Sequence, residues 1–212
     1  MAESTVSGAE LRDAIRRVVA ALKDNSDRLT ELDQAMGDGD LGITAKKIAN
    51  GLEAYIDDAP PEDDLGKYVM TAGMKVNSAA PSTMGTLIAS GLMRAGREAK
   101  GKAELDGATL AAMFRAAVQG IQERGKAKPG DKTLIDALHP AAEAFAEAVE
   151  RGDGLQAAAR EMVAAAEKGL ESVTPLQSRI GRAGWVGERT QGKVDPGCAF
   201  AVVVLRALAG MD

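Results

Sequence analysis

The sequence contains very little of three residue types that many active sites use. Its 212 residues include one histidine, one cysteine and only 3% aromatic residues. The single Cys198 excludes an internal disulfide and a multi-cysteine zinc site. The single His139 excludes any site that needs two imidazoles from this chain. Carboxylates, lysine, arginine, hydroxyl groups and glycine backbone are therefore the groups left for chemistry.

A basic surplus and a long apolar run are also missing. The net charge is −5, so the chain has no basic footprint for nucleic acid. The first residues are polar and acidic, unlike a secretory signal, and the apolar run at 198–205 stops at Arg206, too short to span a bilayer. We therefore expect a soluble, cytoplasmic protein that binds neither nucleic acid nor membranes.

Alanine and glycine are abundant instead, with 40 and 24 residues. Alanine favours closely packed helices because it loses no side-chain entropy on helix formation. Apolar residues recur at helical spacing between 11 and 22, after a capping box at Ser7–Glu10. Similar patterns predict helices over 26–36, 43–59 (ending before Pro60-Pro61), 62–77, 82–99, 107–124, 134–151, 155–170 and 197–209. Strand-length alternation is absent, so we predict an all-α antiparallel bundle formed by one domain, 1–212.

Three carboxylates lie close together in a glycine-rich turn: Asp33, Asp38 and Asp40. Glycines at 37 and 39 allow a tight turn in which the three side chains can converge. Converging carboxylates repel one another, and a hard cation such as Mg²⁺ relieves that repulsion. The triad could therefore share two Mg²⁺ ions beneath a polyphosphate. Alternatively, Asp38 and Asp40 are turn and N-cap residues of the next helix.

Two further segments suit phosphate binding. Residues 41–44 form the first turn of a helix, whose free N–H groups and dipole attract anions. The segment 178–197 is long for a connection between helices, and in it Arg182, Arg189 and Lys193 surround two acidic residues. Arginine suits bidentate phosphate binding, although the segment could also be a solvated charged loop.

Three stretches, LDQAMGDGDLG (32–42), RGKAKPGDKTLIDALHPA (124–141) and GRAGWVGERTQGKVDPG (181–197), resemble signatures of the dihydroxyacetone kinase L subunit. That subunit is the nucleotide-binding half of the kinase, and the resemblance covers nearly the whole chain. It implies a barrel of eight antiparallel helices with ADP or ATP and two Mg²⁺ ions at one end.

The resemblance also assigns roles to residues of this chain. The Mg²⁺ ligands would be Asp33, Asp38 and Asp40, and the residues acting in phosphoryl transfer would be Asp38, Asp40 and Arg182. The nucleotide would contact Leu41, Gly42, Ile43, Thr44, Ala79, Ala80, Gly125, Leu134, Arg182, Asp195, Pro196 and Gly197. Within this set Gly125 and Leu134 would border the adenine, although Leu134 could equally be a core residue.

Two departures from the family pattern affect phosphate contacts. Leu41 stands where the family often has histidine, and the loop around Ala79 and Ala80 has less glycine than usual. In the family the ketone is held covalently by a histidine of a separate K subunit, a role that His139 does not match. The resemblance therefore implies a phosphotransferase that acts only with a K-type partner.

Several readings of the function stay open at this stage. The phosphoryl donor could be exchangeable Mg-ATP, or bound ADP recharged by a phosphocarrier protein. The chain could instead be a non-catalytic Mg-ADP-binding regulatory module. It could also be a kinase subunit for a different acceptor, such as a fatty acid or a four-carbon ketose.

Overall fold

The computed structural model describes residues 5–59 and 63–211, without the side chain of Arg182. Pro60, Pro61 and the start of the helix predicted at 62 lie outside these residues. The elements, in chain order, are β1 (Val6–Ser7), α1 (Gly8–Asp24), α2 (Ser26–Gln34), α3 (Leu41–Asp58), α4 (Leu65–Ala79), α5 (Thr83–Glu98), β2 (Glu104–Leu105), α6 (Gly107–Gly125), α7 (Leu134–Glu150), α8 (Leu155–Val173), α9 (Gly181–Val186), the 3-10 helix η1 (Gly187–Thr190) and α10 (Pro196–Ala209).

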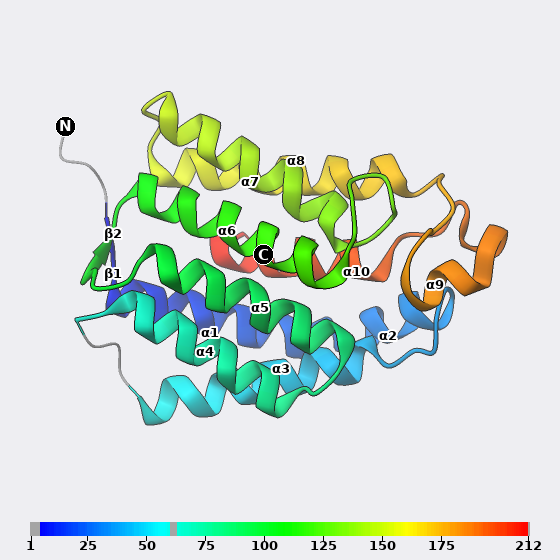
Figure 1. The fold of residues 1–212 in the computed structure, drawn as a ribbon, viewed down its shortest axis with the longest axis horizontal. Coiled ribbons are helices and arrows are strands. Elements are labelled where there is room, and N and C mark those ends of the chain that lie inside the picture. Colours follow the sequence, from blue (N-terminus) through cyan, green and yellow to red (C-terminus); the bar gives the residue numbers. More distant parts are fainter. Residues whose placement is uncertain (1–4, 60–62, 212) are drawn as a thin grey trace.

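Eight of the described helices are long and form a closed ring. Around the ring, α1 packs on α3, and α3 to α8 then pack successively; α8 packs on α10, which returns to α1. Neighbouring helices run in opposite directions (Figure 1). This confirms the predicted all-α fold of eight antiparallel helices. Short α2 and α9 lie together at one end of the ring, and β1 and β2 lie at the other (Figure 1).

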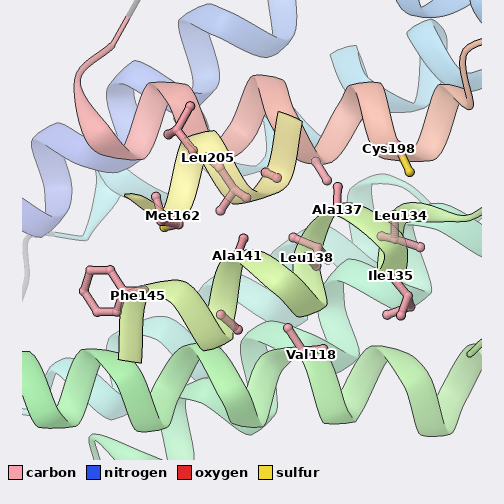
Figure 2. Close-up of a cluster of buried hydrophobic side chains, with 14 of the residues drawn as sticks. Val118, Leu134, Ile135, Ala137, Leu138, Ala141, Phe145, Met162, Cys198 and Leu205 are labelled. Carbon is pink, nitrogen blue, oxygen red and sulfur yellow. The ribbon is translucent and has the colours of Figure 1, made fainter. Parts of the chain in front are cut away.

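The interior of the ring is built from small and branched apolar side chains. Figure 2 shows part of this core, where α7 and α10 meet along alanines and leucines. The ring pair Tyr55–Tyr68, with centroids 4.9 Å apart, is the aromatic contact found among the described residues. So few large side chains leave an apolar cavity of about 460 Å³ inside the ring. None of the helices that the structure describes is long and apolar enough to cross a membrane.

Glycine allows two helix pairs to approach closely. On α3, a Cβ at Gly42 would clash with the Ser26 carbonyl and the Thr30 hydroxyl of α2. On α8, a Cβ at Gly169 would clash with the Asp136 carbonyl of α7. The Asp136 carbonyl lacks its usual helix hydrogen bond, because the residue four positions later is Pro140, which has no N–H. These two contacts fix the positions of the starts of α3 and α7, which carry candidate site residues.

Two local features differ from the sequence prediction. A two-residue antiparallel pair joins β1 to β2, in register Val6 with Leu105, and is too short for any alternation pattern to reveal. The segment 178–197 is not irregular throughout, because α9 and η1 form within it. The capping box at Ser7 and Glu10 is confirmed. Helix limits otherwise lie within about three residues of those predicted.

Candidate functional site

Every segment predicted to bind metal or nucleotide lies at the α2/α9 end of the ring (Figure 1). Because neighbouring helices are antiparallel, the starts of α3, α5, α7 and α10 meet the ends of α2, α4, α6 and α8 there. The order of the helices therefore brings together stretches that are far apart in the sequence. The first and last of them, at Asp33 and Gly197, are about 160 residues apart.

The three carboxylates of Asp33, Asp38 and Asp40 converge, with one oxygen from each within 4.8 Å of the others. Asp33 lies in the last turn of α2, and its backbone carbonyl accepts from the N–H groups of Met36 and Gly37, which turns the chain. Gly39 follows with φ of +77°, a left-handed conformation that glycine adopts without strain. The turn therefore folds Asp38 and Asp40 back toward Asp33.

The capping interactions of α3 bear on the N-cap interpretation of this turn. Asp40 occupies the N-cap position, but its side chain makes no capping hydrogen bond. Asp33 performs that role instead, since its Oδ2 accepts from the Leu41 N–H at 3.1 Å. This hydrogen bond fixes the Asp33 carboxylate within the cluster. Three carboxylates held this way form the all-oxygen, anionic donor set that suits Mg²⁺.

The first turn of α3 presents backbone rather than side chains to this cluster. Leu41 and Thr44 are buried, whereas Ile43 is 56% exposed. The N–H of Leu41 is bonded to Asp33 and that of Thr44 to the Asp40 carbonyl. Gly42 and Ile43 are the other two residues of this first turn, where the N–H groups of a helix lack an intrahelical acceptor and can bind an anion. The Leu41 side chain packs into the core, so it contributes no polar group where the family often has histidine.

The remaining predicted nucleotide residues lie on neighbouring helix ends. Ala79 is the last residue of α4, and buried Ala80 follows it as the C-cap, outside the helical conformation. Gly125 is the last residue of α6, against the side chain of Leu87. Leu134 begins α7 and is only 4% exposed, within the core (Figure 2). The position of Leu134 agrees with the core interpretation, and its contact with adenine stays a prediction.

The Asp195-Pro196-Gly197 turn begins α10 and packs against the start of α7. Asp195 caps the helix, with its Oδ1 accepting from the Cys198 N–H at 2.7 Å. Burial raises the pKa of this carboxyl to about 6, although that hydrogen bond and nearby Lys132 act in the opposite direction. Cys198 donates its thiol to the Thr133 carbonyl at 2.9 Å, beside Leu134 (Figure 2). Burial raises the pKa of that thiol, so it is inert.

The 178–197 segment reaches the carboxylate turn through Lys193. The ammonium of Lys193 donates to the Ala35 carbonyl at 2.9 Å, just after α2. The Arg182 backbone lies in α9, but its side chain is outside the described part of the chain, so its role stays a prediction. Trp185, also in α9, is 94% exposed.

Sequence reasoning missed two buried charged residues around the start of α7, Lys132 just before it and Asp136 in its first turn. Asp136 completes a capping box with Thr133, whose N–H it accepts at 2.8 Å, and it also accepts from the Gly130 N–H. The threonine-to-aspartate spacing was a local signal for that box. Lys132 is 1% exposed, and no local pattern marks a lysine as buried.

Comparisons with known proteins show which family the chain belongs to. The DAK2 domain matches residues 35–210. The chain is 31% identical over 186 residues, 87% of each protein, to the ADP-binding subunit DhaL of the PEP-dependent dihydroxyacetone kinase of Escherichia coli K12. It is 30% identical to the corresponding subunit of dihydroxyacetone kinase 2 of Listeria innocua, covering 98% of this chain and 96% of that one.

A solved structure gives the same architecture. The dihydroxyacetone kinase of C. freundii superposes on 95% of this chain with a TM-score of 0.75 and 25% sequence identity. This chain spans 34% of that longer protein. The resemblance seen in the three sequence stretches is confirmed, and the chain belongs to the DAK2 domain family.

Proposed function

We propose that this chain is the nucleotide-binding subunit of a dihydroxyacetone-like kinase. It holds an adenine nucleotide with two Mg²⁺ ions at the α2/α9 end and passes a phosphoryl group to a short ketose held by a separate K-type subunit. The observation that carries the proposal is the convergence of three carboxylates directly before the first turn of α3. The names of the two bacterial relatives, both ADP-binding subunits of dihydroxyacetone kinases, support it.

The roles of the site residues follow from their chemistry. Asp33, Asp38 and Asp40 would hold the Mg²⁺ ions, which when bound neutralise and align the phosphate oxygens. The N–H groups of Gly42 and Ile43 would bind the phosphates at the positive end of the α3 dipole. Arg182 would stabilise the charge that develops on the transferred phosphoryl group.

The acceptor would come from outside this chain. The resemblance calls for a histidine that holds the ketone covalently, and His139 is half-buried inside α7 near Glu143. A K-type partner therefore has to bring the acceptor hydroxyl to the α2/α9 end. This division leaves the choice among dihydroxyacetone, four-carbon ketoses and other acceptors to the partner.

Two phosphoryl donors fit the same site. The names of both bacterial relatives include "PEP-dependent" and "ADP-binding", which favours ADP that stays bound and is recharged by a phosphocarrier protein. Gel filtration of protein loaded with Mg-ADP distinguishes bound, recharged ADP from exchangeable ATP. Retention of ADP, with no turnover on added ATP, is expected for the recharged form, whereas ready exchange supports direct use of ATP.

The defining experiment is reconstitution with a K-type subunit, Mg²⁺, dihydroxyacetone and either ATP or the phosphocarrier system. Asp38→Asn and Asp40→Asn should each reduce turnover at least a hundredfold. The matched control is Asp57→Asn, which removes an exposed carboxylate from the last turn of α3, at the opposite end of the ring. Full turnover in both triad variants would refute the metal assignment. Mg-ADP binding with no transfer to any ketose would favour the regulatory module. Transfer to a fatty acid but to no ketose would favour a kinase subunit for a different acceptor.

A further inference from the structure

Lys132 is a buried cation whose hydrogen bonds join two distant parts of the chain. Its side chain is 1% exposed, and its ammonium donates to three backbone carbonyls: Thr174 at 2.8 Å, Leu176 at 2.9 Å and Thr190 at 2.7 Å. An ammonium has three N–H donors, so these contacts use its full capacity. No other group is required to satisfy it.

The three carbonyls lie near the two ends of one loop, residues 174–192. Thr174 and Leu176 are at its beginning, and Thr190, the last residue of η1, is near its end. The Gly192 N–H donates to the Thr174 carbonyl at 3.0 Å, and the Ser178 N–H donates to the Thr190 hydroxyl at 2.9 Å. Lys132 thus enters the loop from outside and holds its two ends together.

The same cation faces the start of α10. The buried carboxylate of Asp195 favours the charged form of Lys132, whereas burial lowers the pKa of the ammonium. Lys132 also lies two residues before Leu134, at the start of α7. Hydrogen bonds of one side chain therefore join the residues just before α7 to the loop with Arg182. The Asp195-Pro196-Gly197 turn lies near enough for the Asp195 carboxylate to act on the charge of Lys132.

Local preferences oppose a lysine at this position. Its backbone has φ of +62°, in the left-handed region that favours glycine. Burying an ammonium is also unfavourable unless its hydrogen bonds are fully replaced. A glycine would remove the backbone strain, and an apolar residue would remove the cost of burying a charge. Neither could donate hydrogen bonds to the three carbonyls. The contacts of the side chain are therefore what a lysine adds here.

We propose that Lys132 is a positioning residue of the nucleotide site. By holding both ends of the 174–192 loop against the starts of α7 and α10, it keeps Arg182 and the Asp195 turn closed over the bound nucleotide. This inference rests on the proposed function. Lys132 itself touches protein backbone rather than nucleotide, so its removal should affect retention of the nucleotide more than the number of sites.

The test is the release rate of a fluorescent ADP analogue in Mg²⁺ from Lys132→Met, whose side chain has a similar length but no charge. We expect release at least tenfold faster, with one site per chain at saturation. A general loss of folding would lower the number of sites instead. Tryptic cleavage after Arg179 or Arg189 should also accelerate in the nucleotide-free protein. The control is Lys128→Met, the same change at an exposed position of the same turn.

A second variant, Lys132→Gln, covers the case in which Lys132→Met does not fold. Its amide keeps two N–H donors for the three carbonyls that Lys132 now holds. It should also release the analogue faster than the wild-type protein. Wild-type release rates in the folded variants would overturn the positioning role alone. Failure of the wild-type protein to bind the analogue would overturn the proposed function and this inference with it.

Discussion

Replacing Asp195 with asparagine should change how the stability of the protein depends on pH. Asparagine is as good an N-cap as aspartate, so the hydrogen bond from the Cys198 N–H can be retained. What the substitution removes is the titration of a carboxyl that is 5% exposed. The comparison therefore isolates the ionisation of Asp195 from its capping role.

The size of the effect follows from the shift in pKa. Burial raises the pKa of Asp195 from 3.8 to about 6. A raised pKa in the folded state means that the native protein binds this proton more tightly than the unfolded chain does. The resulting stabilisation is complete below pH 3.8 and is lost as the pH rises through about 6. A shift of about two units corresponds to about 3 kcal/mol.

Urea unfolding at pH 7, 6, 5 and 4, in the presence of EDTA, measures this difference. The stability of the wild-type protein relative to Asp195→Asn should increase by roughly 2–3 kcal/mol on going from pH 7 to pH 4. Asp106→Asn is the matched control, because Asp106 also caps a helix but hydrogen bonding to Thr109 lowers its pKa. The stability of the wild-type protein relative to Asp106→Asn should decrease as the pH falls. A flat or decreasing difference for Asp195→Asn would refute the reasoning.

Three further predictions test the helix packing and the loop. Gly42→Ala should destabilise the protein by about 1–3 kcal/mol, because its Cβ would overlap α2; thermal unfolding should show a decrease of several degrees. Gly169→Ala should also lower the melting temperature despite the helix propensity of alanine, because its Cβ would overlap the Asp136 carbonyl. Gly154→Ala, whose Cβ would meet open space, should lower it less, since it only replaces glycine by a poorer N-cap at a cost of about 1 kcal/mol or less. An equal melting temperature for these two variants would contradict the packing argument. Trp185 should fluoresce like a solvent-exposed indole and be quenched readily by acrylamide; shielded emission would show that α9 packs differently.

Local sequence patterns were sufficient for most of the fold. Helical periodicity, capping residues and glycine or proline breaks depend on neighbours within a few positions, and the eight long helices followed from them. The carboxylate turn was also local, since Asp33 and Asp40 are seven residues apart. The short pairing of β1 with β2 could not be predicted, because it joins residues about a hundred positions apart through two residues each.

The sequence by itself determined which groups are left for a site, since one histidine and one cysteine exclude paired imidazoles or thiols, and it predicted one of carboxylates, arginine and glycine backbone. Only the tertiary structure decided which side chain makes which hydrogen bond. It showed that Asp33, and not Asp40, caps α3, and that Lys132 is buried against carbonyls more than forty residues away. The reason is physical: a hydrogen bond or a desolvation cost depends on which distant backbone the fold brings within about 3 Å, and no local pattern encodes that distance.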